Sequence, residues 1–424
     1  MKLNRRLIVI GSALACGAAL SPRALASGII LYEYGTPDVG LASAGFASRA
    51  SAAATLYKNP AGMSQLSGSQ FQGGAQVLFG KVSFTPNDQT SASLGSNAGG
   101  NGLPVLPAAS LFYTHQINDQ WSVGLGTLSY FGLASKYDDN WVGRYYVQKS
   151  ALIGMSVLPT VSYKVNEWLA VGAGLNAMYG FLDSQMAVNN GPGWSDGQLT
   201  LKDHNWGFGA NAGVLVKLSD QTRVGASYLS RVKLDFAVTP ERSGPFRPAL
   251  AALLDRVGQV ALGVTVPQQV MAGVYHDLNS QWSLMLDAGW QNWAAFGEPT
   301  IAVTDANATS ITLNSDFQNT WHLAGGAEFR LNPAWTFTGG VGYDSSMMTD
   351  ANRTVTLPSG STWRFGAGAR WQVSKRVNLG AAYELLWNGD LSVDQERGPL
   401  AGRVAGTYQD SYIMVVALNL VWNL

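Results

Sequence analysis

The sequence predicts an all-β fold, a transmembrane antiparallel β-barrel, and three observations lead to this prediction. The chain of 424 residues is 46% hydrophobic and only 13% charged, which is about half the charge of an ordinary soluble domain. After residue 26, no uninterrupted apolar stretch is long enough for a transmembrane helix. Apolar and polar residues instead alternate with period two over many segments, as in strands that face lipid on one side and a lumen on the other.

The composition excludes several other classes of protein. Disorder does not fit a chain that is 11% aromatic. Nucleic-acid binding is not expected, because 27 basic residues against 27 acidic ones leave no net positive charge. The single Cys and the four scattered His offer neither metal-ligand spacing nor a nucleophile with a histidine base. We therefore expect no cofactor, no metal and no enzymatic activity.

Residues 1–26 are expected to form a signal peptide. They contain the three parts of such a peptide, namely the positive residues Lys2, Arg5 and Arg6, the apolar stretch 7–20 and the cleavage site Ala24-Leu25-Ala26. The apolar stretch is too short to anchor the chain across a bilayer. A lipoprotein acylated at Cys16 is the alternative, but the bulky aliphatic residue Leu14 lies one position away from its place in a good lipobox. The protein is thus expected to be exported.

The alternation is clearest in the C-terminal half of the chain. Every second residue from Tyr412 to Leu424 is apolar. Between 362 and 373, tryptophans and small apolar residues share one face, whereas Arg364 and Arg370 fall on the other. A soluble sandwich also alternates, but its polar face would lie outside and would carry more Lys and Glu. The scarcity of charge favours lipid as the surroundings of the apolar face.

The spacing of the turns predicts the topology. Six short polar turns recur at 118–121, 166–168, 219–222, 279–282, 332–335 and 374–377. Seven longer stretches rich in Gly, Asn, Ser, Asp and Pro lie between strands, at roughly 85–105, 134–150, 189–200, 240–259, 295–308, 345–361 and 388–410. Together they connect about 14 strands, and an even number leaves both chain ends on the turn side. A Trp closes four of the six turns, where it would lie at the membrane interface.

The segment 27–69 differs from the barrel, which we assign to 70–424. It is rich in Ala, Ser and Gly, as at 40–45 and 52–54, and shows little period-two pattern. Small residues suit a compact piece packed inside a barrel, where there is little room. The alternative is a flexible periplasmic tail, against which the apolar residues of this segment argue. We therefore expect a small N-terminal helical hatch that plugs the lumen.

Several motifs resemble the FadL family of outer-membrane transporters for long-chain fatty acids and other hydrophobic compounds. The N-terminal hatch of that family is similar to Gly28-Ile29-Ile30-Leu31-Tyr32-Glu33, Gly40-Leu41-Ala42-Ser43-Ala44-Gly45 and Asn59-Pro60-Ala61-Gly62-Met63. The region that the family carries after its third strand resembles Asn140-Trp141-Val142-Gly143-Arg144-Tyr145 and Leu158-Pro159-Thr160-Val161-Ser162-Tyr163. The resemblance covers the whole mature chain. One departure is Leu424, because such barrels usually end in an aromatic residue.

The resemblance implies a location in the outer membrane of a Gram-negative bacterium and passive uptake by lateral diffusion. A hydrophobic ligand is caught in a groove between extracellular loops, passes to a pocket in the barrel, and leaves sideways through the wall after the hatch shifts. Long-chain fatty acids are the expected ligands, and outer-membrane lipid and lipopolysaccharide the expected surroundings of a monomer. Uptake of aromatic hydrocarbons, a non-specific diffusion porin and an adhesin or structural barrel are the alternatives.

The resemblance also supplies candidate site residues. Asn59, Pro60, Ala61 and Gly62 are the candidate hatch residues, although an ordinary turn would have the same sequence. The Arg144 guanidinium could hold a fatty carboxylate bidentately, or it could form a lumen salt bridge to Glu or Asp.

Other candidate residues come from local patterns. Residues 248–254 predict a short apolar helix in a long loop, and exposed apolar loop surface marks interaction sites. Leu250, Leu253 and Leu254 are therefore candidate ligand-capture residues, with simple loop packing as the alternative. The charged residues that fall on the lumen face are expected to form internal ion pairs: Glu328, Arg330, Arg364, Arg370 and Glu384.

A lateral exit requires a break in the hydrogen-bonded wall. The third strand contains Gly124, Gly126 and Gly132, which permit kinks or bulges. The fourth strand carries Pro159, which cannot donate a ladder hydrogen bond. The resemblance also indicates a kinked third strand, so we expect the lateral opening there. The alternative is that the glycines pack against the hatch and that Pro159 marks a harmless bulge.

Overall fold

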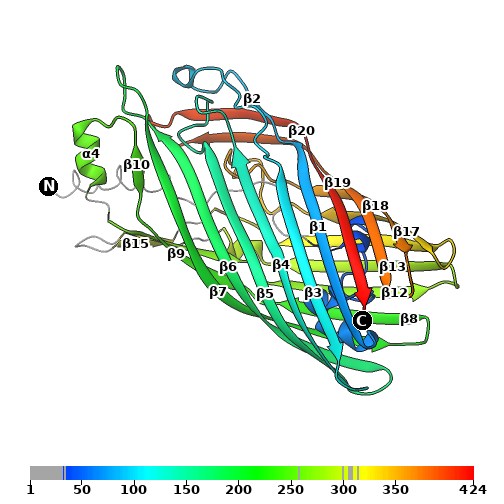
Figure 1. The fold of residues 1–424 in the computed structure, drawn as a ribbon. Helices are drawn as coiled ribbons and strands as arrows, with labels where there is room; N and C mark the ends of the chain where they lie inside the picture. Colours follow the sequence, from blue (N-terminus) through cyan, green and yellow to red (C-terminus); the bar gives the residue numbers. More distant parts are fainter. Residues whose placement is uncertain (1–31, 33–34, 256–257, 298–299, 304–308, 313–314) are drawn as a thin grey trace.

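The computed structural model describes residues 32, 35–255, 258–297, 300–303, 309–312 and 315–424. The predicted signal peptide with Cys16, and most of the first hatch motif, lie outside the described residues. The main sheet has sixteen strands, of which β2 (Phe84–Pro86) and β10 (Glu241–Ser243) are short additions at the rim. The other fourteen form an antiparallel barrel closed by pairing of β1 with β20 (Figure 1). The predicted barrel and its strand number are confirmed.

The barrel strands follow one another in chain order. They are β1 (Ser69–Lys81), β3 (Leu106–Gln116), β4 (Trp121–Lys136), β5 (Lys149–Lys164), β6 (Leu169–Val188), β7 (Gly197–Lys217), β8 (Thr222–Leu229), β12 (Gln269–Asp277), β13 (Trp282–Gln291), β16 (Thr320–Arg330), β17 (Trp335–Asp344), β18 (Thr362–Gln372), β19 (Val377–Glu396) and β20 (Arg403–Asn423). Each pairs with its neighbour, so the chain needs no crossover connection.

Asn and Ser side chains build the six short turns. In the turn after β3, the Asn118 Oδ1 atom accepts hydrogen bonds from the backbone N–H groups of Gln120 (2.9 Å) and Trp121 (2.8 Å), which is the geometry of an Asx turn. Equivalent acceptors close the other five turns: Asn166, Ser219, Asn279, Asn332 and Ser374. The start of β1 and the end of β20 also lie on this side, where the Leu424 N–H donates to the Ser69 carbonyl at 2.9 Å.

Several long loops are shorter or more ordered than the sequence predicts. The prediction of a loop at 388–410 is wrong, because β19 continues to Glu396 and β20 already begins at Arg403. Backbone pairing does not depend on side-chain polarity, so these polar stretches still form a ladder above the membrane. The expected loop at 189–200 is likewise reduced to the residues between Val188 and Gly197.

The expected loop at 240–259 belongs to a larger excursion that covers 230–268 between β8 and β12. It contains β9 (Val232–Val238), β10, α4 (Pro248–Leu254) and β11 (Val260–Val266). The strands β9 and β11 form a second, four-stranded sheet with β14 (Thr300–Val303) and β15 (Thr309–Thr312). Its strand β9 packs on the inner face of β6 and β7, where Gly180 and Gly207 leave room for Leu234.

Two rows of outward aromatic residues show where the membrane lies. On β18, Trp363 and Trp371 are each 43% exposed, and they are eight residues, or about 26 Å, apart along the strand. Trp335 and Tyr343 have the same spacing on β17. An apolar band of outer-membrane barrels is about 25 Å tall and is bounded by aromatic girdles. The barrel therefore presents a lipid-facing belt between its turns and its loops.

A compact N-terminal segment fills the turn-side half of the lumen. It comprises α2 (Thr36–Gly40), α3 (Thr55–Lys58) and the 3-10 helix η2 (Pro60–Gln65), drawn in blue inside the barrel in Figure 1. Nearly all of its side chains between Thr36 and Met63 are buried. The expected helical hatch is thus present among the described residues.

Glycines in the wall let the hatch backbone come close to the strands. A Cβ atom at Gly340 of β17 would overlap the carbonyl oxygen of Leu41, and one at Gly366 of β18 would overlap that of Val39. Small lumen-facing residues are therefore a condition for the plugged barrel, which explains part of the high Gly content.

This close approach can be tested with a matched pair of substitutions. Gly340→Val places a side chain against the Leu41 backbone, whereas Gly339→Val points into open space. Because overpacking costs about 1–3 kcal/mol and a backbone oxygen cannot turn aside, Gly340→Val should displace the hatch and raise ion conductance in planar bilayers about tenfold or more. Gly339→Val should conduct like the unchanged protein. Equal conductance of both variants, with folded barrels, would contradict the packing.

Candidate ligand path and lateral opening

One buried charge and two buried N–H groups of the hatch have their partners on the barrel wall. Arg49 forms a salt bridge with Glu328 of β16, at 2.5 Å between Nη2 and Oε1, and both side chains are almost fully buried. Asp287 of β13 accepts hydrogen bonds from the backbone N–H groups of Gly45 (2.5 Å) and Ala47 (3.0 Å). Removing one partner of such a buried pair is strongly destabilising. These contacts therefore fix the hatch in one position.

The predicted hatch residues Asn59, Pro60, Ala61 and Gly62 lie together at the start of η2 and are buried. The Asn59 Oδ1 atom accepts from the Ala61 N–H at 3.1 Å, so Asn59 caps this helix. Its Nδ2 group donates to the Ala47 carbonyl at 2.6 Å and to the Val214 carbonyl of β7 at 2.9 Å. Asn59 is thus a helix cap and a contact between hatch and wall at once.

The charged lumen residues predicted from the sequence form ion pairs, with one exception. Arg364 binds Asp344 at 2.6 Å and Glu384 at 3.4 Å, and Arg330 binds Asp277 at 3.0 Å. Glu328 pairs with the hatch residue Arg49, as described above. Arg370 donates instead to the Thr336 hydroxyl, at 3.4 Å.

A bulge in β4 interrupts the regular alternation of the wall. The register with β5 shifts between Ser129 and Phe131, so Tyr130 and Phe131 are both buried, at 1% and 2% exposure. The Tyr130 ring packs edge-to-face on Tyr57 of the hatch helix α3, with 5.6 Å between centroids. The bulge therefore brings an aromatic side chain of β4 into contact with the hatch.

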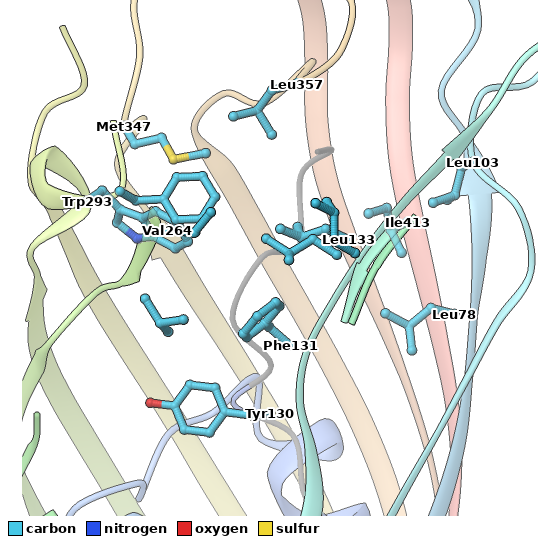
Figure 2. Packing of buried hydrophobic residues seen from close by; sticks show 14 of the residues in the cluster. Leu78, Leu103, Tyr130, Phe131, Leu133, Val264, Trp293, Met347, Leu357 and Ile413 are labelled. Atoms are coloured by element: carbon cyan, nitrogen blue, oxygen red, sulfur yellow. The ribbon is translucent and has the colours of Figure 1, made fainter. Parts of the chain in front are cut away.

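An apolar cluster lies between the hatch and the loops. Figure 2 shows Tyr130, Phe131 and Leu133 of β4 facing residues from strands and loops around the barrel. The other labelled members are Leu78, Leu103, Val264, Trp293, Met347, Leu357 and Ile413. Among the described residues, the interior above the hatch thus contains many large apolar side chains, which suits a hydrophobic ligand.

The hydrogen-bonded wall opens between β3 and β4. Their pairing ends at Ser110 and Leu128, although β3 begins at Leu106 and β4 continues to Lys136. Beyond that point Ser129 Oγ lies 3.5 Å from the N and O atoms of Ala109. A groove of about 480 Å³ lies at the gap. It is lined by Ala75, Gln76, Val77, Pro107, Ala108, Ala109, Ser129, Val416 and Leu418.

The break lies on the predicted strand but not at the predicted glycines. Gly124 and Gly126 are paired on both sides, and the space beside them is filled by Leu56 and Met63 of the hatch. This corrects their assignment to the opening, because both act as packing positions. Gly132 lies in the part of β4 that pairs with β5 alone among the described strands.

Pro159 coincides with a second irregularity. It pairs with Leu125 of β4, but the ladder between β5 and β6 stops at Val157 and resumes only at Thr160. Proline has no N–H to donate to that ladder. This gap is on the neighbouring interface, one strand away from the opening.

Arg144 is engaged by a neighbouring loop. Its guanidinium binds Asp196 at 2.9 Å and donates to the carbonyl oxygens of Leu94 (2.9 Å) and Trp141 (3.2 Å). The Tyr145 hydroxyl donates to the same Asp196 carboxylate at 2.8 Å. Burial and the nearby carboxylate raise the pKa of Tyr145 to about 12, so the phenol remains a donor at neutral pH. Arg144 therefore joins three loop segments. The salt-bridge alternative is confirmed as to the Asp partner, but the pair lies between loops and not in the lumen.

The predicted loop helix is present as α4, which lies at the loop end of the barrel (Figure 1). Leu250 and Leu254 are half-buried, and the side chain of Leu253 lies outside the described atoms. Sequence reasoning missed Tyr130, Ala109 and Ser129. A signal was available for the bulge, since two large aromatic residues in succession at 130–131 reverse the period-two alternation of β4.

The comparisons with known proteins agree with this architecture. The family described as "Outer membrane protein transport protein (OMPP1/FadL/TodX)" matches residues 17–420. The chain belongs to this family. A long-chain fatty acid transport protein of Escherichia coli O6:H1 is 26% identical, over 90% of this chain and 92% of its own. The barrel is thus that of an outer-membrane protein.

Two solved structures share the fold. A Pseudomonas aeruginosa FadL homologue superposes with a TM-score of 0.81 and 21% identity, over 94% of this chain and 100% of its own. The Pseudomonas putida toluene transporter TodX gives a TM-score of 0.68 and 16% identity, over 93% and 99%.

The role of Asn59 can be tested with Asn59→Asp. The carboxylate retains the acceptor for Ala61 but loses both hydrogen bonds that Asn59 donates to carbonyl oxygens. Since each hydrogen bond contributes about 0.5–1.5 kcal/mol, opening of the hatch should increase about tenfold. Maleimide labelling of a cysteine at the fully buried Ala53 would report opening, because Cys16 is the only native cysteine. Labelling unchanged from the Ala53→Cys parent would show that Asn59 serves only as a cap.

Proposed function

We propose that this protein takes up hydrophobic compounds across the outer membrane, with long-chain fatty acids as the first candidates, and releases them sideways between β3 and β4. The observation that carries the proposal is the gap above Ser110 and Leu128, where an apolar groove meets the lipid-facing surface of the barrel. A water-filled porin would not need this opening, and the described part of the hatch fills the turn-side half of the lumen. Uptake by a porin is therefore disfavoured.

The proposed route has four parts. The ligand is captured at the loop end, where Leu250 and Leu254 of α4 are half-buried. It then enters the apolar cluster, whose burial of an alkyl chain stabilises it by about 0.8 kcal/mol per CH₂. The hatch moves, and the motion reaches the wall through the contact between Tyr57 and Tyr130. The ligand leaves through the gap into the bilayer.

The chain is proposed to be divided accordingly. Residues 1–26 are removed as a signal peptide, 27–69 form the hatch and 70–424 the barrel. We propose that the transporter acts as a monomer in a membrane of outer-membrane lipid and lipopolysaccharide, without enzymatic activity. Within the hatch, four residues hold η2 against β6 and β7, namely Asn59, Pro60, Ala61 and Gly62. Beside the gap, Gly132 and Pro159 make β4 and β5 easier to deform.

The exit can be blocked by a disulfide. Ala109→Cys with Ser129→Cys would join β3 and β4 where Ser129 Oγ already approaches the Ala109 backbone. Because the opening would be closed, oxidation should reduce oleate uptake into cells about tenfold or more, and reduction should restore it. The disulfide and the folded barrel are verified by gel mobility.

A matched control is the pair Leu128→Cys with Ser156→Cys, which joins β4 and β5 where the ladder is intact. Oxidation of this pair should leave uptake unchanged. Uptake that continues with a complete Ala109–Ser129 cross-link would mean that the ligand leaves by another route.

Aromatic hydrocarbons are the second candidate class, because Arg144 is already neutralised by Asp196 and the fold is shared with a toluene transporter. A fatty carboxylate would have to exchange with Asp196 for the guanidinium. Asp196→Asn should then strengthen oleate binding, whereas Arg144→Ala should weaken it, each by about tenfold for one charge-assisted hydrogen bond. Toluene binding should be insensitive to both changes. Oleate affinity is measured by calorimetry in detergent. If it changes in the same direction in both variants, Arg144 only holds the loops together and does not bind the fatty carboxylate.

A further inference from the structure

Three lysines gather on the outward face of β4 to β7 near their loop ends. Lys136 lies directly opposite Lys149 in the ladder between β4 and β5. Lys202 of β7 lies opposite Asp183 of β6, and Lys149 Nζ binds Asp183 at 2.7 Å. Like charges directly opposite one another destabilise a sheet, and one carboxylate here stands among three ammonium groups. These four residues, called the lysine row below, therefore carry excess positive charge.

The lysine row lies just beyond the outer aromatic girdle. Toward the turns, the same face carries Tyr179 and Phe181 on β6, and His204 and Trp206 on β7. The Tyr179 ring lies 5.2 Å from Trp206 and 5.5 Å from His204. Trp206 and Lys202 are four residues apart, about 13 Å along the strand. Since aromatic girdles mark the edge of the hydrocarbon, the lysine row is at the level of lipid headgroups.

We propose that the lysine row binds the phosphate groups of lipid A, the phosphorylated glycolipid of the outer leaflet. Its ammonium groups supply the charge that a phosphate at this depth requires, and the aromatic residues below supply a surface for the acyl chains. Glu241 of β10, opposite Thr200, bounds the site toward the loops. The inference rests on the outer-membrane location of the barrel and not on which compound is transported.

The test is binding of lipid A to the purified full-length barrel in detergent, followed by native mass spectrometry. Lys136→Gln, Lys149→Gln and Lys202→Gln are combined in one variant. Since each lysine near an anionic lipid contributes about 1 kcal/mol, we expect the affinity for lipid A to fall about 100-fold. Lipid A from which the phosphates have been removed should bind the unchanged protein as weakly as intact lipid A binds the variant.

The matched control changes lysines at the turn ends of the same strands, Lys164→Gln with Lys217→Gln, which pair with Glu167 and Asp220. It should bind lipid A like the unchanged protein. Equal occupancy in the triple variant and this control would overturn the proposal, as would equal binding of dephosphorylated lipid A. Displacement of lipid A by millimolar inorganic phosphate alone would show a general anion site and would also overturn it. Oleate uptake, measured in parallel, should not separate the two variants.

Discussion

The plugged lumen depends on one constraint, which is that buried polar groups of the hatch need partners, and several of these partners lie on the inner wall. Arg49 finds Glu328, the N–H groups of Gly45 and Ala47 find Asp287, and Asn59 reaches the backbone of β7. Left unpaired, such groups would each cost several kcal/mol in the absence of water. The barrel therefore carries polar residues and glycines on its inner wall directly opposite the hatch groups that they contact. The position of the hatch follows from these contacts.

The same constraint explains where the wall can open. Two ladders beside the hatch are interrupted. The ladder between β5 and β6 stops at Val157 and resumes at Thr160. In β4, the bulge between Ser129 and Phe131 turns two aromatic rings inward, and the pairing with β3 ends at Leu128. Tyr57 of α3 packs on Tyr130 at this bulge. The hatch is thus in direct side-chain contact with the strand that borders the gap.

Sequence patterns predicted the fold more completely than the site. Alternation identified the lipid face, and the Asn- and Ser-based turns fixed the strand number, because both signals act over a few neighbouring residues. The small residues of the hatch predicted its presence. The boundaries of the loops could not be predicted, since the ladder of β19 and β20 extends through polar residues. Gly124 and Gly126 were assigned to the opening, but their role depends on Leu56 and Met63, which are distant in sequence.

The sequence by itself determined which residues face lipid, how many strands cross the membrane and that the first and last barrel strands meet at the turns. Each of these follows from local periodicity and turn chemistry. Only the tertiary structure decided that Arg144 is held by Asp196, that Ala109 and Ser129 border the gap, and that three lysines from separate strands form one row. These depend on contacts between segments that are far apart in the sequence. Arg144 meets Asp196 through the packing of two loops, the gap follows from the bulge in β4, and the lysine row follows from the pairing of β4 to β7. Local periodicity and turn chemistry alone do not bring these residues together.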